Sequence, residues 1–327
     1  MTMNANVALI IPCGHDHGQL MKLFDYVAAQ TILPREIIIV DSSIDRGSCP
    51  RTIQMFCTES NVILIYLSRE RCLPGAARNI GLECATSQWI AFLDIRTHPV
   101  KDWLERQLEF ILKNDLSGAF GSSAFLANSA FSKLVRDGIY GRVPVLHLPG
   151  SVVGRALISR VGYFISTIRA GEDGDWIERI VLLGEPVRES PVVTACYKGL
   201  FDMTLVDYVR KWSLYYGSTR TMPFHLPQKV MLWWVFYFGS VFLSFNWNRL
   251  LANWDTQSLF YISDVTKISI IAPIVCYWLY RSFLIPRRRG VPIFDLLPIR
   301  FLPIGFICFL LDSVKFYSLL VPCSRPR

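Results

Sequence analysis

Short apolar runs, each followed by an acidic residue, mark the first hundred residues of the chain. The run Ile37–Val40 ends at Asp41, and the run Trp89–Leu93 ends at Asp94. Short runs of β-branched and aromatic residues between helical patterns predict buried parallel strands. Ligands of open α/β sheets bind beyond the carboxyl ends of such strands. We therefore expect Asp41 and Asp94 to lie at the mouth of one crevice.

Longer apolar segments dominate the last hundred residues. A bilayer is crossed by about 20 apolar residues in a helix. Arg281 lies near the end of one segment, where it can snorkel, whereas Asp312 and Lys315 interrupt another. One turn apart, these two residues either pair within a spanning helix or place that segment in the interface. The pattern predicts two or three transmembrane helices, at about 230–247, 268–285 and 302–321.

Basic residues flank these segments. Arg287–Arg289 follows the second segment, and Arg210, Lys211, Arg220 and Lys229 precede the first, so the positive-inside rule places both flanks in the cytoplasm. The basic and aromatic stretch at about 204–222 is typical of an interfacial helix. The sequence thus predicts a cytosolic α/β domain over 1–225, with halves at about 5–105 and 106–205, and a multi-pass membrane region over 226–327.

Composition supports a membrane protein. The 327 residues are 52% hydrophobic and only 18% charged, with a mean hydropathy of +0.33, which is too apolar for an ordinary soluble enzyme. The net charge of +8 lies beside the apolar segments, which favours anionic headgroups or a diphosphate over nucleic acid as partner. The nine cysteines form no zinc-like C-x-x-C pair, so we expect reduced, mostly buried thiols. The N-terminus shows no secretory signal pattern.

Several short motifs between Val7 and Leu104 follow one another in a characteristic order and spacing. They are I-I-P at 10–12, L-P-R-E at 33–36, V-D-S-S-I-D at 40–45, A-R-N-I-G at 77–81, F-L-D at 92–94, and Pro99 to Trp103. In this order the region resembles the nucleotide-sugar-binding half of family 2 glycosyltransferases of the GT-A fold. The resemblance implies a Rossmann-like, mostly parallel sheet and a nucleotide-sugar donor.

The donor side is predicted from the same motifs. The resemblance places the nucleotide at Asp41, with Ser43 in a polar turn suited to a ribose or base edge and Pro12 lining the pocket. The alternative for Asp41 is a turn or cap carboxylate. Arg78 matches a family position beside the donor, where a guanidinium can face a diphosphate. The alternative for Arg78 is a structural ion pair.

The metal motif departs from the family pattern. The usual Asp-x-Asp holds the Mg²⁺ or Mn²⁺ that neutralises the leaving diphosphate, but here the motif is Asp94-Ile95-Arg96, and an arginine has no lone pair for a metal. Asp94 with His98, or with a distant histidine such as His225, could retain an unusual site. Alternatively, Arg96 itself supplies the positive charge, or the activity is lost.

A base is predicted at an acidic motif near residue 172. The resemblance implies that Asp173 takes the acceptor proton in an inverting transfer, with Glu172 as its neighbour. Three acidic residues at a helix start also suit capping and the helix dipole.

These observations predict a membrane-associated inverting glycosyltransferase of the inner cell membrane. It would use a nucleotide sugar and a lipid-linked or polysaccharide acceptor at the cytoplasmic face. Two or three transmembrane helices are too few for a translocating channel within one chain, which argues against a self-sufficient processive synthase. A homo-oligomer could still form such a channel. The alternative is an inactive membrane scaffold with the same fold.

Overall fold

The computed structural model describes residues 4–14, 16–43, 48–201, 203–219 and 226–320, and only the backbone at 218–219, 226–233 and 319–320. The chain forms two compact units. Unit 1 comprises Met1–Ser132 and Arg142–Met203, and unit 2 comprises Lys133–Gly141 and Thr204–Arg327. The stretch predicted as an interfacial helix thus groups with the C-terminal helices.

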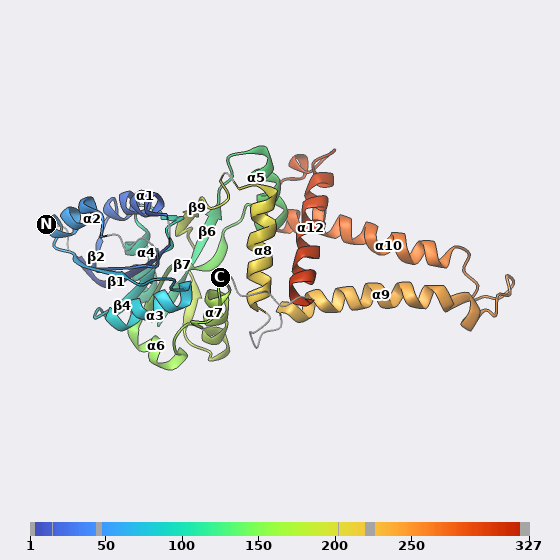
Figure 1. Ribbon diagram of the computed structural model, residues 1–327, viewed down its shortest axis with the longest axis horizontal. Helices are drawn as coiled ribbons and strands as arrows, with labels where there is room; N and C mark the ends of the chain where they lie inside the picture. Colours follow the sequence, from blue (N-terminus) through green and yellow to red (C-terminus); the bar gives the residue numbers. More distant parts are fainter. Residues whose placement is uncertain (1–3, 15, 44–47, 202, 220–225, 321–327) are drawn as a thin grey trace. The chain divides into compact units, whose positions relative to one another are not determined.

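Unit 1 is built around a sheet that has nine strands in the described residues (Figure 1). Its strands are β1 (Asn4–Cys13), β2 (Leu33–Asp41), β3 (Ile63–Ser68), β4 (Trp89–Phe92), β5 (Thr97–Pro99), β6 (Gly118–Phe125), β7 (Val145–Gly154), β8 (Val187–Glu189) and β9 (Ala195–Tyr197). Its helices are α1 (His17–Ala28), α2 (Arg51–Glu59), α3 (Pro74–Cys84), α4 (Trp103–Lys113), α6 (Arg155–Val161) and α7 (Glu172–Leu182).

The sheet has the order β3-β2-β1-β4-β7-β6-β9-β5, and β8 also pairs with β6. Strands β1 to β4 pair in parallel, whereas β7 is antiparallel to both β4 and β6. The chain runs outward from β1 to β3 and then returns to the other side of β1 for β4. This reversal makes the carboxyl ends of β1, β2 and β4 the switch point at which open α/β sheets bind ligands. The predicted α/β class is confirmed, and the strands predicted at 37–40 and 89–93 correspond to β2 and to β4, which ends at Phe92.

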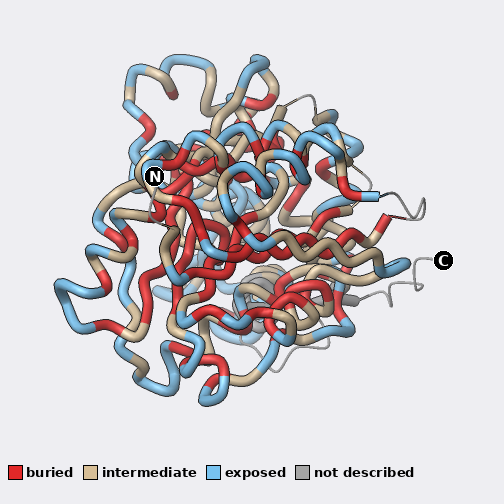
Figure 2. Tube along the Cα trace, turned by 90° about the vertical axis from the view of Figure 1, so that its left-hand side faces the viewer, coloured by how far each residue is buried: buried red, intermediate tan, exposed pale blue. Residues whose placement is uncertain are grey.

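Side chains along the central strands alternate between two cores, because successive residues of a strand face opposite sides. Val7, Leu9 and Ile11 of β1 belong to the core with α1, α2 and α4, whereas Ala8 and Ile10 belong to the core with α3, α6 and α7. Buried positions, red in Figure 2, recur along the strands. With both faces covered, the strand runs are continuously apolar.

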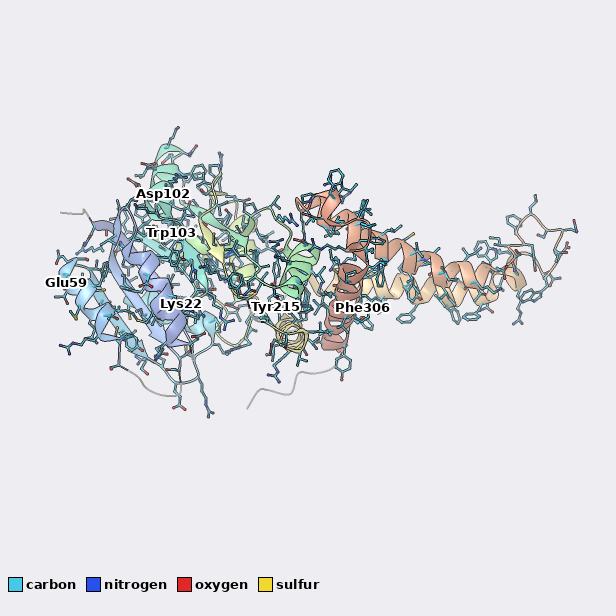
Figure 3. The ribbon with its side chains drawn as sticks, turned by 90° about the horizontal axis from the view of Figure 1, so that it is seen from above. Lys22, Glu59, Asp102, Trp103, Tyr215 and Phe306 are labelled. Atoms are coloured by element: carbon cyan, nitrogen blue, oxygen red, sulfur yellow. The ribbon has the colours of Figure 1, made fainter. Side chains whose placement is uncertain are left out.

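The first turn of α4 fixes that helix to the edge of β7. Trp103 begins α4 (Figure 3), is 2% exposed, and donates from its indole nitrogen to the carbonyl oxygen of Gly150 at 2.7 Å. A buried indole needs such a partner. The contact ties the start of α4 to β7, the strand that pairs with β4.

Unit 2 is helical in its described part. Its elements are part of α5 (Ala130–Val135), the π-turn η1 (Arg136–Tyr140), α8 (Leu205–Thr219), α9 (Leu226–Leu251), α10 (Val265–Leu279), the π-turn η2 (Tyr280–Leu284), α11 (Ile285–Arg288), the 3₁₀ turn η3 (Ile293–Asp295) and α12 (Phe301–Leu320). Within the unit, α8 packs on α12 and α9 packs on α10.

Two stretches of unit 2 are long and apolar enough to cross a membrane, by length and composition alone. They are Val265–Arg288 and Phe301–Ser318. Within an 18-residue apolar window, 6% of the first stretch and 33% of the second is buried. The core helix of a soluble protein would be mostly buried, whereas these two stretches expose most of their apolar surface. Two such helices are by themselves weak evidence for a membrane. The predicted segment 230–247 lies in α9, but the side chains of 230–233 lie outside the described residues.

Candidate active site

The predicted donor residues gather at the carboxyl ends of β1 and β2. Pro12 pairs with Val40 in the parallel register, and Asp41 is the last residue of β2. The Asp41 carboxylate is fully buried. Its oxygens accept hydrogen bonds from the Tyr66 hydroxyl and from the Ser43 backbone nitrogen at 2.9 Å. Asp41 is thus a fixed element of this edge of the sheet.

His17, at the start of α1, also contacts this carboxylate. Its Nε2 lies 2.8 Å from Asp41 Oδ2, and 38% of the His17 side chain is exposed. Sequence analysis gave His17 no role, because neither spacing nor motif links it to Asp41. Two further positions in this region, His15 and Asp45, lie outside the described residues.

Asp41 contributes stability that depends on pH. Burial alone raises its pKa, but hydrogen bonds from Tyr66, Ser43 and His17 outweigh burial and lower the pKa below its ordinary value. The ionised carboxylate therefore stabilises the fold above the unfolded-state pKa of about 3.9, and this contribution is lost as pH falls through the lower folded-state pKa. We expect Asp41→Asn to lower the thermal unfolding midpoint at pH 7 and to have a shrinking effect below about pH 4. An equal loss at pH 7 and pH 3, or the same loss with exposed Asp25→Asn, would contradict this expectation.

Arg78 is the centre of the second group of predicted residues. Its side chain is 3% exposed and donates from Nη1 to Glu172 Oε1 at 2.5 Å and from Nη2 to Asp94 Oδ1 at 2.9 Å. Burial alone lowers the pKa of Arg78, but Asp94, Glu172 and Asp173 outweigh it and raise the pKa, so the guanidinium stays charged. Arg78 joins α3, the end of β4 and the start of α7. This geometry favours the structural alternative, and a diphosphate contact by Arg78 stays a prediction.

Small and polar residues of α3 allow this close approach. A side chain at Gly75 would collide with the carbonyl oxygen of Ile165, and one at Gly81 would meet the Ile10 side chain 2.6 Å away. Asn79 exchanges two 2.9 Å hydrogen bonds with the backbone of Phe164. The A-R-N-I-G motif therefore fastens α3 to β1 and to the segment that leads into α7.

Glu172 and Asp173 open α7 but have different surroundings. The helix is preceded by Gly171 at φ 93°, in the left-handed region that favours glycine. Glu172 is 4% exposed, and burial raises its pKa; Arg78 opposes this shift, and the nearby Asp173 charge adds to it. Asp173 is half-buried and accepts a hydrogen bond from the Gly174 backbone nitrogen at 2.9 Å. Glu172 is therefore held in an ion pair with Arg78, and Asp173 is the carboxylate that remains accessible to a substrate.

His147 is a residue of this group that sequence analysis missed. It lies in β7, and its ring packs edge-on against Phe125 with centroids 6.3 Å apart. Burial lowers the pKa of His147; Asp94 and Asp173 oppose this shift, and Arg78 adds to it. These influences place a neutral imidazole beside the carboxylates. No sequence motif surrounds His147, and its position opposite Gly121 of β6 depends on strand pairing.

Asp94 and Arg96 do not form a conventional divalent-cation site. One oxygen of Asp94 is bound to Arg78, while 37% of its side chain is exposed. Arg96 is half-exposed, and its Nη2 lies 3.8 Å from Asp16 Oδ2 at the start of α1. A cation at Asp94 would have one protein carboxylate, already shared with Arg78, and would take its other oxygen ligands from the diphosphate of the donor and from water. Arg96 offers no ligand, so use of Mg²⁺ or Mn²⁺ stays a prediction.

His98, one of the histidines proposed as additional ligands, does not complete that site. His98 is buried in β5 and stacks on Tyr26, with ring centroids 4.5 Å apart. Burial, Lys198 and Lys22 lower its pKa, so its charged neighbours are cations. A metal ion at His98 would meet like charge, and the structure does not join His98 to Asp94. His225 lies outside the described residues.

One other group has ligand atoms close enough for a metal, within the part of the chain that is described. Cys13, His17 and Asp41 place one ligand atom each within 4.8 Å of the others. Metals bind the thiolate, and burial, Asp41 and Asp16 raise the pKa of Cys13 to about 12. Without a bound cation the thiol is protonated, and the hydrogen bonds that Asp41 accepts account for the position of His17 beside it.

A comparison with protein families matches the part of the chain that holds most of this site. Residues 8–130 match the family described as Glycosyl transferase family 2. The match covers less than half of the chain, so it shows that this region is similar to the family. The matched region contains both strand ends, Arg78 and the Asp94–Arg96 motif, whereas Glu172 and Asp173 lie beyond it.

Relatives and a solved structure agree with this class. The chain is 25% identical over 246 residues to the "Pre-mycofactocin glycosyltransferase" of Mycobacterium tuberculosis (strain ATCC 25618 / H37Rv), covering 68% of this chain and 49% of that protein. It is 25% identical over 203 residues to "Glycosyltransferase AglE" of Haloferax volcanii, covering 58% and 66%. The chain thus spans about half the length of the first relative. "Mannosyltransferase PcManGT from Pyrobaculum calidifontis in complex with GDP-Man and Mn2+" has a TM-score of 0.56 at 16% identity, covering 99% of this chain and 89% of that one, which supports a GT-A-like fold.

Proposed function

We propose that this protein is a membrane-associated, inverting glycosyltransferase that moves a sugar from a nucleotide-diphosphate sugar to a lipid-linked or polysaccharide acceptor at the cytoplasmic face. The observation that carries the proposal is the group formed by Asp94, Glu172 and Asp173 around the buried Arg78. This group lies at the carboxyl side of a sheet whose first half is similar to a glycosyltransferase family.

Asp173 acts as the general base in this proposal. Its carboxylate takes the proton of the acceptor hydroxyl while the hydroxyl oxygen attacks the anomeric carbon. The bond from that carbon to the diphosphate breaks on the opposite face, and its electron pair leaves with the nucleoside diphosphate. Arg78 is a positioning residue, since it fixes Glu172 and hence the first turn of α7. His147, whose pKa is lowered by burial, adds no positive charge beside Asp173.

The donor side is assigned to the ends of β1 and β2. The buried Asp41 orders the Ser43 backbone nitrogen and the exposed edge of His17, next to Pro12. A nucleotide sugar is the donor class, in keeping with the GDP-Man in the PcManGT title. A screen of nucleotide sugars identifies the nucleobase and the sugar of the donor.

Arg96 supplies the positive charge for the leaving diphosphate. Its guanidinium is half-exposed, and its 3.8 Å contact with Asp16 is longer than a hydrogen bond, so it can turn toward a donor. A guanidinium matches two phosphate oxygens. We expect Arg96→Gln to lower nucleoside diphosphate release about tenfold or more, with the exposed Arg35→Gln as matched control. Activity of the unsubstituted protein should survive a chelator. Complete loss in chelator with restoration by Mn²⁺ would assign the charge to a metal instead.

Membrane association rests on unit 2. Large apolar side chains such as Phe236, Phe242 and Ile271 are exposed on α9 and α10, which is costly in water and favourable in lipid. The basic run Arg287–Arg289 follows one apolar helix, which supports a cytoplasmic position for that end. A membrane-held enzyme meets an acceptor that is itself membrane-held, and this favours a lipid-linked acceptor.

The first experiment is a donor and acceptor screen. The full chain in non-ionic detergent would be incubated with a panel of nucleotide sugars and a membrane lipid extract, and the released nucleoside diphosphate measured. Lipid-dependent release by the unsubstituted protein supports the proposal. Donor binding without release from any acceptor, unchanged by Asp173→Asn, would instead support an inactive scaffold.

A further inference from the structure

A cavity inside unit 2 has a polar and positively charged lining. Its volume is about 580 Å³, and its charged lining residues are Arg281, Arg289, Lys315 and Asp312. Three cations and one carboxylate leave an excess of two positive charges. None of these residues belongs to the active site described above, and all of them belong to unit 2.

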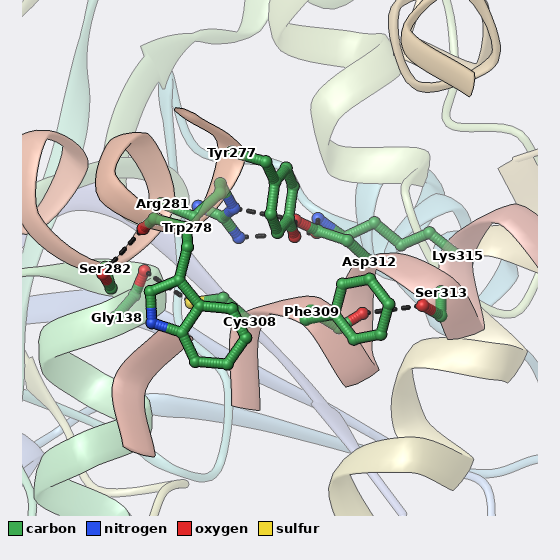
Figure 4. Close-up of polar contacts among 10 residues, drawn as sticks. All are labelled: Gly138, Tyr277, Trp278, Arg281, Ser282, Cys308, Phe309, Asp312, Ser313 and Lys315. Carbon is green, nitrogen blue, oxygen red and sulfur yellow. Dashed lines mark hydrogen bonds and ion pairs between the residues drawn. The ribbon is translucent and has the colours of Figure 1, made fainter. Parts of the chain in front are cut away.

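Asp312 neutralises only part of this charge. Its carboxylate accepts hydrogen bonds from Arg281 Nε at 2.7 Å, from the Tyr277 hydroxyl at 2.7 Å and from Lys315 Nζ (Figure 4). The side chains of Arg281, Asp312 and Lys315 are only 14%, 16% and 12% exposed. A shared carboxylate leaves this buried trio with a net positive charge, which is costly without an anion. For Arg289, the described residues offer no carboxylate partner.

The backbone and the aromatic walls of the cavity also indicate a ligand. Arg281 lies in the short π-helix η2, and single turns of π-helix are frequent at functional sites. Lys315 Nζ lies 4.3 Å from the ring centroid of Trp212 and 5.3 Å from that of Tyr216. Aromatic rings beside cations are typical of headgroup depth at a membrane surface.

An apolar cavity shares two walls with the charged one. It has a volume of about 270 Å³, and Trp234 and Tyr277 line both cavities. Its other lining residues include Pro273, Ile274 and Phe309 from α10 and α12. Unit 2 therefore has a positively charged cavity beside an apolar one, with Trp234 and Tyr277 lining both.

We propose that unit 2 binds one lipid with a phosphate or diphosphate headgroup, the headgroup between Arg281, Arg289 and Lys315 and the start of the lipid chain against Trp234 and Ile274. A free phosphate accounts for the charged cavity but not for the apolar one beside it. Identification of this lipid as the acceptor rests on the proposed function. Binding itself does not, since it needs no sugar donor.

The test is native mass spectrometry of the full chain in non-ionic detergent, titrated with dioctanoyl phosphatidic acid. We expect one lipid per chain and at least about tenfold weaker binding of dioctanoylglycerol, which lacks the phosphate. Arg289→Gln should weaken phosphatidic acid binding about tenfold or more and leave dioctanoylglycerol unchanged, whereas the exposed neighbour Arg288→Gln should change neither. Ile274→Trp fills the apolar cavity and should remove the advantage of dioctanoyl over dibutyryl phosphatidic acid.

Three results would overturn the inference. The first is equal binding of the lipids with and without phosphate. The second is the same loss from Arg288→Gln as from Arg289→Gln. The third is displacement of phosphatidic acid by inorganic phosphate at equal concentration, which would indicate a free-phosphate site. The binding test contains no donor, so lipid binding here, combined with no nucleoside diphosphate release in the donor and acceptor screen, would leave this inference standing and count only against the proposed function.

Discussion

Asp173→Asn should lower the rate of nucleoside diphosphate release about 100- to 10,000-fold, the range that a positioned general base contributes. The amide keeps the shape of the side chain and its contact with the Gly174 backbone but cannot take a proton. Because Asp173 is half-buried and holds no ion pair among the described residues, the fold should be retained. The measurement is single-turnover transfer with saturating donor, together with donor affinity.

The matched control is Glu178→Gln, a half-buried carboxylate on the same helix without a site contact in the described structure. It should leave transfer within about twofold, in line with the small effects of substitutions away from a site. Donor affinity should be equal in both variants, since the base acts only on the acceptor proton. A full rate for Asp173→Asn, or an equal loss in both variants, would remove Asp173 from the mechanism.

Much of unit 1 could be predicted from the sequence, because buried parallel strands are apolar along their whole length. The run Ile37–Val40 is such a case. The pattern could not extend that strand to Glu36, a charged residue that is 1% exposed. Its carboxylate accepts hydrogen bonds from the backbone and side chain of Thr86, and these lower its pKa although burial raises it. A partner 50 residues away leaves no local signal. Three-residue strands such as β5 and β8 are too short to show a period.

The candidate site was predictable where a motif ends a strand, as at Asp41 and Asp94. Contacts that depend on tertiary folding were not predictable. His147 is held in the sheet by the antiparallel pairing of β7 with β6, opposite Gly121, and His17 comes to Asp41 through the start of α1. The spacing of Asp312 and Lys315 allowed the ion pair that the structure shows, but Arg281 and Arg289, which complete the charged cavity of unit 2, lie outside that helix and gave no local signal.

Arg78→Met should produce the largest loss of stability among the variants discussed. Removing one partner of a buried ion pair leaves the other charge uncompensated, which costs about 3–5 kcal/mol. Glu172 is 4% exposed, and its Oε2 already has no hydrogen-bond partner in the described structure. Water could therefore not solvate the Glu172 carboxylate once Arg78 is removed. For a domain of this size the loss corresponds to a fall in the unfolding midpoint of about 6–20 °C.

Thermal unfolding of the full chain in detergent, followed by circular dichroism, measures this fall. Exposed Arg51→Met is the matched control and should change stability by less than about 0.5 kcal/mol. Adding Glu172→Gln and Asp94→Asn to Arg78→Met removes the uncompensated charges and should recover most of the midpoint, because replacing all members of a buried charge group costs less than breaking it. If the triple variant were no more stable than Arg78→Met, packing of the arginine stem against Phe164, whose ring centroid lies 5.7 Å from the guanidinium carbon, would be the larger contribution.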